Sequence, residues 1–218
     1  GTLYGRKHPP GGAVSFFTRK PDLDGNNGYL TLGYGNYDTK TVQGAAEFTL
    51  VPDVLGIRIA GTRSKGDGWQ YNPAQGRHVG TTDTIGGRVS LRWKPTDRLD
   101  INLKFYTAKD DPLGANAYAI GQLEGDRDAL GYSRFDPAQN GGRALRRNEV
   151  SADTGGTNYT KSTGGSLNIS YELSDDVTLT SITGFDKGRY AIDPNDCDGS
   201  PNDLCAIRFR SRSNNSIR

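Results

Sequence analysis

The chain has 218 residues, of which 33% are hydrophobic, and its formal net charge is +2. This near balance of charges argues against a nucleic-acid-binding surface, which needs a clustered basic face. No run of apolar residues approaches the ~18 that a transmembrane helix requires. The low mean hydropathy of -0.69 therefore excludes helical membrane proteins. It leaves open a membrane barrel, in which only alternate strand residues face lipid.

Glycine (30 residues) and tyrosine (11 residues) are abundant, and methionine is absent. A composition rich in glycine and tyrosine, with many short strands, is typical of all-β proteins. The opening at Gly1 and the absence of methionine lead us to expect an excerpt from a longer chain. No signal peptide is visible, and an excerpt from a longer chain would not carry one.

A short apolar strand is expected at 13–18, after a loop rich in glycine and proline. From Tyr29 onward apolar and polar residues alternate, as they do in strands with one apolar face. The expected strands are 29–34, 41–50, 55–62, 84–94, 99–106, 166–173 and 177–190, with the start of another at 207–218. In the strand at 177–190, Ile182 falls on the polar face, which suggests a bulge.

The spacing of these strands favours a membrane barrel over a soluble sheet. Strands of ~9–12 residues suit a tilted bilayer crossing, and short turns alternate with long loops at about 65–82 and 110–161. Charged residues opposite the apolar face are Glu47, Arg58, Arg88, Arg92, Asp100, Lys104 and Glu172. Aromatic residues near strand ends, typical of interfacial girdles, are Tyr34, Trp93, Tyr171 and Phe185. A soluble β-sandwich, with these polar faces in water, remains open at this point.

The opening residues resemble a known family. The segments GTLYGR at 1–6 and GGAVSFFTRKP at 11–21 are similar to the end of the plug domain in TonB-dependent outer-membrane receptors. The segment GYGNYD at 33–38 resembles the first barrel strand and turn of that family, and LTSITGF at 179–185 resembles a later strand. One departure is the insertion of 7–10, where the family has Asn and a shorter step to the Gly-Gly pair.

The resemblance implies a fold and two domains. Residues 1–21 would be the C-terminal end of the plug domain, including its last strand. Residues 22–218 would form the N-terminal part of a transmembrane β-barrel of about 22 strands. The fold class is therefore all-β, an antiparallel transmembrane β-barrel segment. As a fragment it would form an open curved sheet of about 7–8 strands.

The resemblance also implies a function. The chain would belong to a receptor in the outer membrane of a Gram-negative bacterium, energised by the TonB complex through an upstream segment. Its default solute is a ferric siderophore, with a vitamin or glycan as variants. The alternatives are a passive porin without a plug and a soluble β-sandwich binding module.

Enzymatic activity has little support in the sequence. The histidines, His8 and His78, lie far apart in loops, and no nucleophile elbow or phosphate-binding loop is present. We therefore expect a non-enzyme that requires no cofactor.

Two loops carry candidate sites. Cys197 and Cys205 bracket a short polar loop, which predicts a disulfide and an oxidising compartment. The carboxylates of that loop, Asp196, Asp198 and Asp203, are weak candidates for calcium, although they lack EF-hand spacing. In the loop at 110–161, aromatic and arginine side chains suit contact with an anionic ferric chelate. The candidates for this contact are Tyr118, Tyr132, Arg134 and Arg143.

Overall fold

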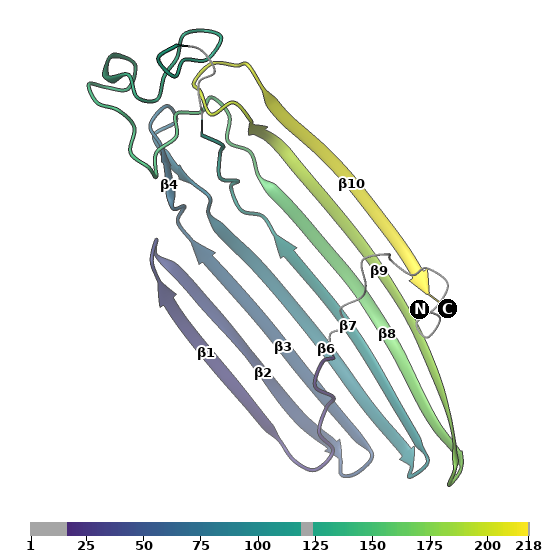
Figure 1. The fold of residues 1–218 in the computed structure, drawn as a ribbon. Coiled ribbons are helices and arrows are strands. Elements are labelled where there is room, and N and C mark those ends of the chain that lie inside the picture. Colours follow the sequence, from purple (N-terminus) through teal and green to yellow (C-terminus); the bar gives the residue numbers. More distant parts are fainter. Residues whose placement is uncertain (1–16, 119–123, 218) are drawn as a thin grey trace.

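The computed structural model describes residues 17–118 and 124–217. Eight long strands form one antiparallel sheet, and two short strands form a separate hairpin in a loop (Figure 1). The long strands are β1 (Asn27–Gly35), β2 (Thr39–Val51), β3 (Leu55–Gly66), β6 (Thr82–Thr96), β7 (Leu99–Asp110), β8 (Asn158–Ser174), β9 (Val177–Asp196) and β10 (Ala206–Ile217). The hairpin consists of β4 (Gln70–Asn72) and β5 (Arg77–Val79). Within the described residues, no helix has the length and apolar character needed to cross a membrane.

Each long strand pairs with its neighbours in chain order, from β1 at one edge to β10 at the other. The connections at 52–54, 97–98 and 175–176 are short and lie at one end of the sheet. The long loops at 67–81 and 111–157 and the cysteine loop lie at the other end (Figure 1). This arrangement confirms the predicted all-β fold and its short turns and long loops.

One short turn lies at the long-loop end. Strands β1 and β2 are joined by a three-residue turn at 36–38, in which Tyr37 and Asp38 both have positive φ. The backbone N–H of Asp67 donates to the carbonyl of Tyr37 at 2.7 Å, which places this turn beside the first long loop.

Strands β8 and β9 are longer than predicted, at 17 and 20 residues. The added residues of β8, 158–165, are mostly polar or glycine on both faces, so the alternation stops before the strand does. Those of β9, 191–196, begin with Ala191 and Ile192 on opposite faces and continue with Asp, Pro and Asn, a pattern without strand alternation. The bulge expected at Ile182 is absent, because Ile182 pairs with Asn168 in an unbroken register. Of the strand predicted at 13–18, only Phe17 and Thr18 lie within the described residues, and neither is in a strand.

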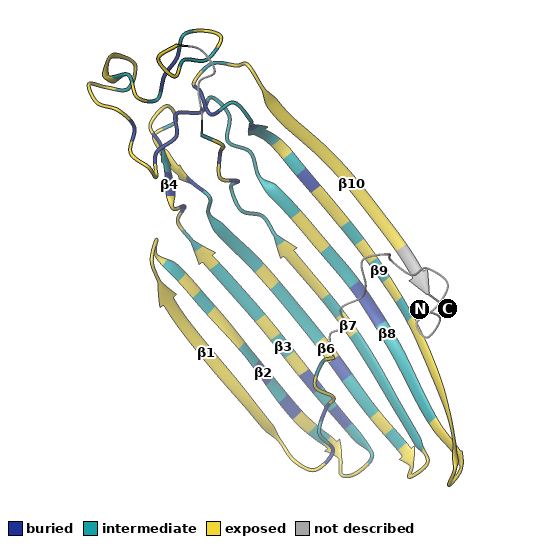
Figure 2. Ribbon diagram, in the orientation of Figure 1, coloured by how far each residue is buried: buried dark blue, intermediate teal, exposed yellow. Residues whose placement is uncertain are grey.

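The two faces of the large sheet differ in character. We call the face touched by residues 17–26 the inner face, and the opposite one the outer face. Outward-facing large hydrophobic side chains are largely exposed: Leu30, Leu32, Phe48, Ile59, Val89, Phe105 and Leu179. Among the described residues no second layer covers them, and most positions of the long strands are exposed or intermediate rather than buried (Figure 2).

Burial on the inner face is polar. Glu47, Arg58 and Ser90 are buried there, whereas the buried apolar cluster of Val79, Val150 and Ala152 lies in the loops. A soluble sandwich would bury its apolar face against a second sheet. The inside-out pattern is that of a membrane barrel wall, with an apolar band outside and a polar lumen inside. The sheet is one segment of such a wall.

Candidate functional site

Residues 17–26 form a strap that crosses the inner face near its short-turn end (Figure 1). Lys20 reaches Asp100 of β7, with Nζ and Oδ2 3.3 Å apart. Further along, the backbone N–H of Asp22 donates to Oε1 of Glu47 on β2 at 2.7 Å. The strap therefore spans the sheet from β7 to β2 before the chain enters β1.

The backbone of the strap lies directly against the wall. The carbonyl of Leu23 accepts a hydrogen bond from the N–H of Asp53 at 3.0 Å, and both Pro21 and Leu23 are buried. At Gly56 of β3, a Cβ atom would stand 2.4 Å from the carbonyl oxygen of Asp22. Glycine at this position permits the close approach, because any larger residue would push the strap off the wall.

A buried ion pair holds the strap. Glu47 is fully buried and bonds the guanidinium of Arg58, its direct cross-strand partner on β3. Arg19 of the strap lies 3.8 Å from the same carboxylate. A buried carboxylate needs this number of partners, since an unpaired buried charge is costly. Glu47 therefore joins two wall strands and the strap in one cluster.

Beside the strap, the inner face contains a hollow of about 500 Å³ bordered by Thr18, Gln43, Thr62, Arg88, Lys104 and Tyr106. Arg88 and Lys104 make no ion pair with any described residue, unlike Arg92, which pairs with Asp100. The hollow thus presents positive charge toward the lumen. It combines uncompensated cations with a phenol, a set suited to an anionic, aromatic solute.

The loops at the other end form a packed unit. The β4–β5 hairpin docks against the loop at 111–157, with Tyr71 bridged to Glu149. The amide of Gln70 bonds the backbone of Asn116 in both directions, at 2.8 and 3.1 Å. The amide of Asn72 likewise bonds both backbone groups of Ala152. Each of these side-chain amides donates one hydrogen bond and accepts another, as a backbone peptide group does at the edge of a strand. These bonds hold the loops in a defined shape.

The four loop residues predicted to contact ligand lie in different environments. The guanidinium of Arg134 stacks on the ring of Tyr118, 4.4 Å from its centroid, and Tyr118 also bonds the carbonyl of Arg147. Tyr132 is buried, and its hydroxyl donates to Asn140 at 3.0 Å. Burial raises the pKa of Tyr132. Tyr118 and Arg134 thus form one cation–π pair, and Tyr132 packs inside the loop.

Arg143 is held within the loop by Glu149. Its two terminal nitrogens lie 2.6 and 2.7 Å from the two carboxylate oxygens, a bidentate pair. Glu149 also accepts from the backbone N–H of Arg146 at 2.9 Å. The Arg143 guanidinium, with this N–H bond, lowers the pKa of Glu149 to about 2. Contact of these four residues with a ligand stays a prediction.

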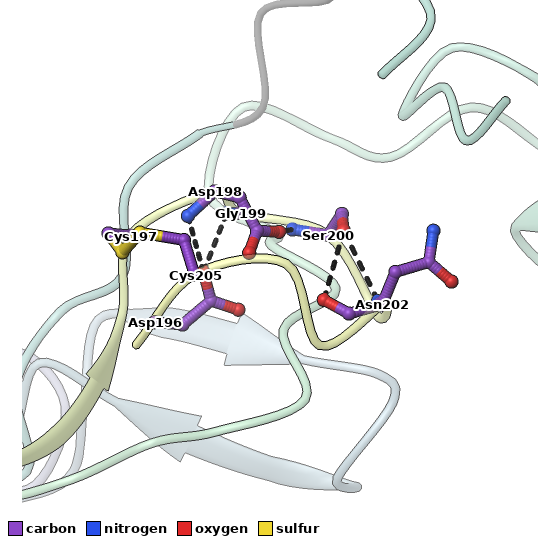
Figure 3. Close-up of a disulfide and its surroundings, with 7 residues drawn as sticks. All are labelled: Asp196, Cys197, Asp198, Gly199, Ser200, Asn202 and Cys205. Atoms are coloured by element: carbon purple, nitrogen blue, oxygen red, sulfur yellow. Dashed lines mark hydrogen bonds between the residues drawn. A yellow bond between two sulfur atoms is a disulfide. The ribbon is translucent and has the colours of Figure 1, made fainter. Parts of the chain in front are cut away.

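The structure joins Cys197 to Cys205, the pair predicted to form a disulfide, with their Cα atoms 5.4 Å apart (Figure 3). Asp196 accepts from the N–H groups of Asp198 and Gly199 at 2.9 and 2.7 Å. Burial, with the nearby charge of Asp198, raises the pKa of Asp196 to about 6.

The weak calcium candidates do not form one group. Asp198 accepts from the N–H of Ser200 at 2.8 Å, so this carboxylate and that of Asp196 stabilise turns of the loop (Figure 3). Within the described residues, no set of three His, Cys, Asp or Glu residues is placed to hold a metal. Calcium binding by Asp196, Asp198 and Asp203 stays a prediction with no support from this geometry.

Sequence reasoning missed the functional role of several residues. The predicted polar face is confirmed as the inner face, but neither Asp22 nor Gly56 was singled out. Gln70 and Asn72 were also missed, because nothing in a loop sequence tells a structural amide from a solvated one. The ion pair of Glu47 and Arg58 could have been predicted from the sequence, since both residues were placed on the same face of adjacent strands.

The fold and the inner face together define a segment of an outer-membrane-type β-barrel wall with a strap across its lumen side. The chain resembles the ferric-catecholate import receptor Fiu from E. coli K12, in its closed form, with a TM-score of 0.62 and 12% identity. It also resembles the siderophore receptor PirA from Acinetobacter baumannii, with a TM-score of 0.53 and 16% identity. These alignments cover 98% and 89% of this chain.

The chain spans less than a third of the length of these receptors, 29% and 27% respectively. No family model matches the sequence, and no curated protein matches it. The likeness at this identity shows the fold alone: the chain has the fold of part of the barrel of these two proteins.

Proposed function

We propose that this chain is part of a TonB-dependent outer-membrane receptor that imports a ferric siderophore. The observation that carries the proposal is the strap, which is fixed across the inner face through Glu47. A passive porin needs an open lumen, whereas a gated receptor needs an occluding domain joined to its wall. In this proposal residues 1–21 end the plug domain, and residues 22–218 begin the barrel.

The chemistry of the solute follows from the charges on the inner face. A ferric chelate with catecholate or carboxylate donors is anionic and bulky, and Arg88 and Lys104 supply unpaired cations beside Tyr106. The stacked pair of Tyr118 and Arg134 offers a first contact at the extracellular side. One structural neighbour is a ferric-catecholate import receptor and the other is a siderophore receptor, which supports the same class of solute here.

The remaining parts of the proposal concern partners. The protein would lie in the outer membrane of a Gram-negative bacterium, in contact with its lipid. The TonB complex would supply energy through a plug segment upstream of this chain. The receptor makes and breaks no covalent bond in its solute, so its activity is transport.

Growth on a panel of ferric chelates tests this function. A strain that lacks the full-length protein should lose uptake of at least one chelate, and loss of TonB should abolish the same uptake. The double variant Arg88→Gln/Lys104→Gln should lower uptake of the anionic chelate about tenfold or more, as expected for two charge-assisted contacts. The matched control Lys94→Gln/Arg98→Gln removes two charges near the short turns and should transport normally.

Two outcomes contradict the proposal. Unchanged uptake of every chelate in the deletion strain removes the siderophore as the solute. Uptake that persists without TonB identifies a passive pore.

A further inference from the structure

A row of cations crosses the outer face of the sheet near the long loops. Lys109 of β7 lies directly opposite Lys161 of β8, and Lys161 lies opposite Arg189 of β9. Arg189 in turn lies opposite Arg212 of β10. The four strands are adjacent in Figure 1. We call Lys109, Lys161, Arg189 and Arg212 the cation row.

The register places this row on the outer face. Phe105 and Phe185, which face outward with their rings 6.3 Å apart, have the same alternation along their strands as Lys109 and Arg189. Lys187 and Arg210 share this face beside the row. Lys187 and three residues of the row, Lys161, Arg189 and Arg212, surround a hollow of about 430 Å³ that Tyr159 and Thr163 also line.

The positive charge of the row is mostly uncompensated. Lys109 pairs with Asp111 at 2.8 Å, and Arg210 lies 3.6 Å from Asp193. Lys161, Lys187, Arg189 and Arg212 are exposed and make no ion pair with any described residue. Like charges directly opposite on adjacent strands are destabilising. The row therefore favours an external anion that bridges several strands.

Tyr159 stabilises part of the row without neutralising it. Its ring contacts one cation on β7 and one on β9: the ring centroid lies 5.5 Å from Nζ of Lys109 and 5.3 Å from the guanidinium of Arg189. A tyrosine at this level suits a membrane interface, where its ring can remain apolar and its hydroxyl wet.

The height of the row on the wall identifies the anion. At the short-turn end the outward residues of β7, β8 and β9 are Leu99, Tyr171 and Leu179. Lys109, Lys161 and Arg189 lie ten positions further along. Ten residues rise ~33 Å along a strand and, at a tilt of about 40°, ~25 Å along the membrane normal, which matches the apolar band of such barrels. The row thus lies at the level of the lipid headgroups on the long-loop side.

We propose that the cation row and its neighbours Lys187 and Arg210 bind the phosphate groups of anionic lipid in the outer leaflet. Arginine and lysine form their strongest exposed contacts with phosphate, arginine in a bidentate manner. The inference rests on the membrane orientation of the proposed function but not on the solute. Such a lipid would be held against β7 to β10, beside the loop that carries Tyr118 and Arg134.

Lipid binding to the full-length protein in detergent tests the inference. Native mass spectrometry would compare bis-phosphorylated lipid A with dephosphorylated lipid A and inorganic phosphate. Wild-type protein should retain the phosphorylated lipid. The variant Lys161→Gln/Lys187→Gln/Arg212→Gln should bind it roughly tenfold to hundredfold more weakly, since each cation contributes to lipid attraction. The control Lys94→Gln/Arg98→Gln/Arg147→Gln removes the same charge elsewhere and should bind like wild type.

Three results overturn the inference: equal retention of dephosphorylated lipid A, an affinity of the row variant within twofold of wild type, or an equal loss in the control. Binding of inorganic phosphate as tight as that of the lipid would assign the row to soluble anions instead. Thermal melts of both variants show whether the barrel is intact. Chelate uptake, measured on the same variants, reports separately on the proposed transport function.

Discussion

At the scale of single residues, Glu47 controls the attachment of the strap. Its carboxylate is the common partner of Arg58, Arg19 and the backbone N–H of Asp22. A charge in this position is tolerated only because each oxygen has a donor. Removing it leaves Arg58 buried with its charge uncompensated, which costs more than the loss of one hydrogen bond.

We expect Glu47→Gln to destabilise the full-length receptor by about 3–5 kcal/mol and to expose the strap to protease. Thermal unfolding in detergent and proteolysis between residues 17 and 26 measure the two effects. Glu172→Gln, an exposed carboxylate on the same inner face, is the matched control and should leave both unchanged. Equal protease resistance of Glu47→Gln and wild type would contradict the role assigned to Glu47.

Glu149 makes the extracellular loop sensitive to acid. Arg143 lowers the pKa of Glu149 to about 2 in the folded loop, whereas an unfolded glutamate titrates near 4.3. The folded form therefore gains stability above about pH 4.3. It loses this stability as the pH falls through 4 toward 2. The protection factors of the Arg146 and Val150 amides, which are exchange rates corrected for their intrinsic pH dependence, should fall over that window. In Glu149→Gln, these protection factors should be low already at neutral pH, and pH-independent protection factors in wild type would refute the assignment.

At the scale of secondary-structure elements, two adjacent glycines of β8 allow side chains to meet across it. On the inner face Tyr106 of β7 passes over Gly164 and donates to Asp186 of β9. On the outer face Phe105 and Phe185 meet over Gly165. Cross-strand aromatic contacts of this kind stabilise glycine-containing strands.

A side chain at Gly165 should disrupt this contact. Its Cβ atom would stand 2.9 Å from Phe105 and 2.8 Å from Phe185, so Gly165→Val should cost about 1–3 kcal/mol through overpacking. Gly35→Val is the control, because a Cβ at Gly35 meets nothing within 4 Å. The denaturation midpoints of the two variants in detergent should differ. Equal midpoints would show that the rings move aside freely.

The disulfide fixes the loop between β9 and β10. For a separation of 8 residues, the loop-closure entropy amounts to about 2–3 kcal/mol. Cys197→Ser/Cys205→Ser should therefore raise amide exchange in residues 197–205. The register of β9 with β10 at Arg189 and Arg212 should persist, because its hydrogen bonds lie outside the loop. Loss of that register in the double variant would contradict a local role.

At the scale of the whole molecule, the part of the sheet that the structure describes has two edge strands. Within residues 17–118 and 124–217, β1 and β10 each pair with one neighbour, so the outer hydrogen-bonding groups of both strands have no strand partner there. The exposed apolar outer face adds a second cause of association.

We expect the isolated 218-residue chain to associate in buffer without detergent, and light scattering after size exclusion would detect this. The edges and the apolar face would both contribute, so detergent should reduce association only in part. A monomer with a sharp, reversible melt in detergent-free buffer would contradict the wall-segment fold.

The alternation of apolar and polar residues was sufficient to predict most of the sheet. The outward Leu, Ile, Val and Phe positions of β2, β3, β6 and β7 were predicted, because a lipid-facing surface requires an apolar residue at every second position. It failed at residues 158–165 of β8 and 191–196 of β9. Residues 158–165 are mostly polar or glycine on both faces, and Pro194 and Asn195 in β9 are typical of a turn, so the pattern in both places resembles a loop.

The sequence by itself determined the all-β fold, the inner and outer faces, the side of the long loops and the disulfide. Each of these depends on local chemistry: residue alternation, turn residues and the short spacing of Cys197 and Cys205. Only the tertiary structure decided the strap contact with Glu47, the amide pairing of Gln70 with Asn116 and the alignment of the cation row. Those contacts join residues far apart in the sequence: Asp22 and Glu47 are 25 positions apart, and Gln70 and Asn116 are 46 positions apart. They depend on the register between strands, which no local pattern encodes.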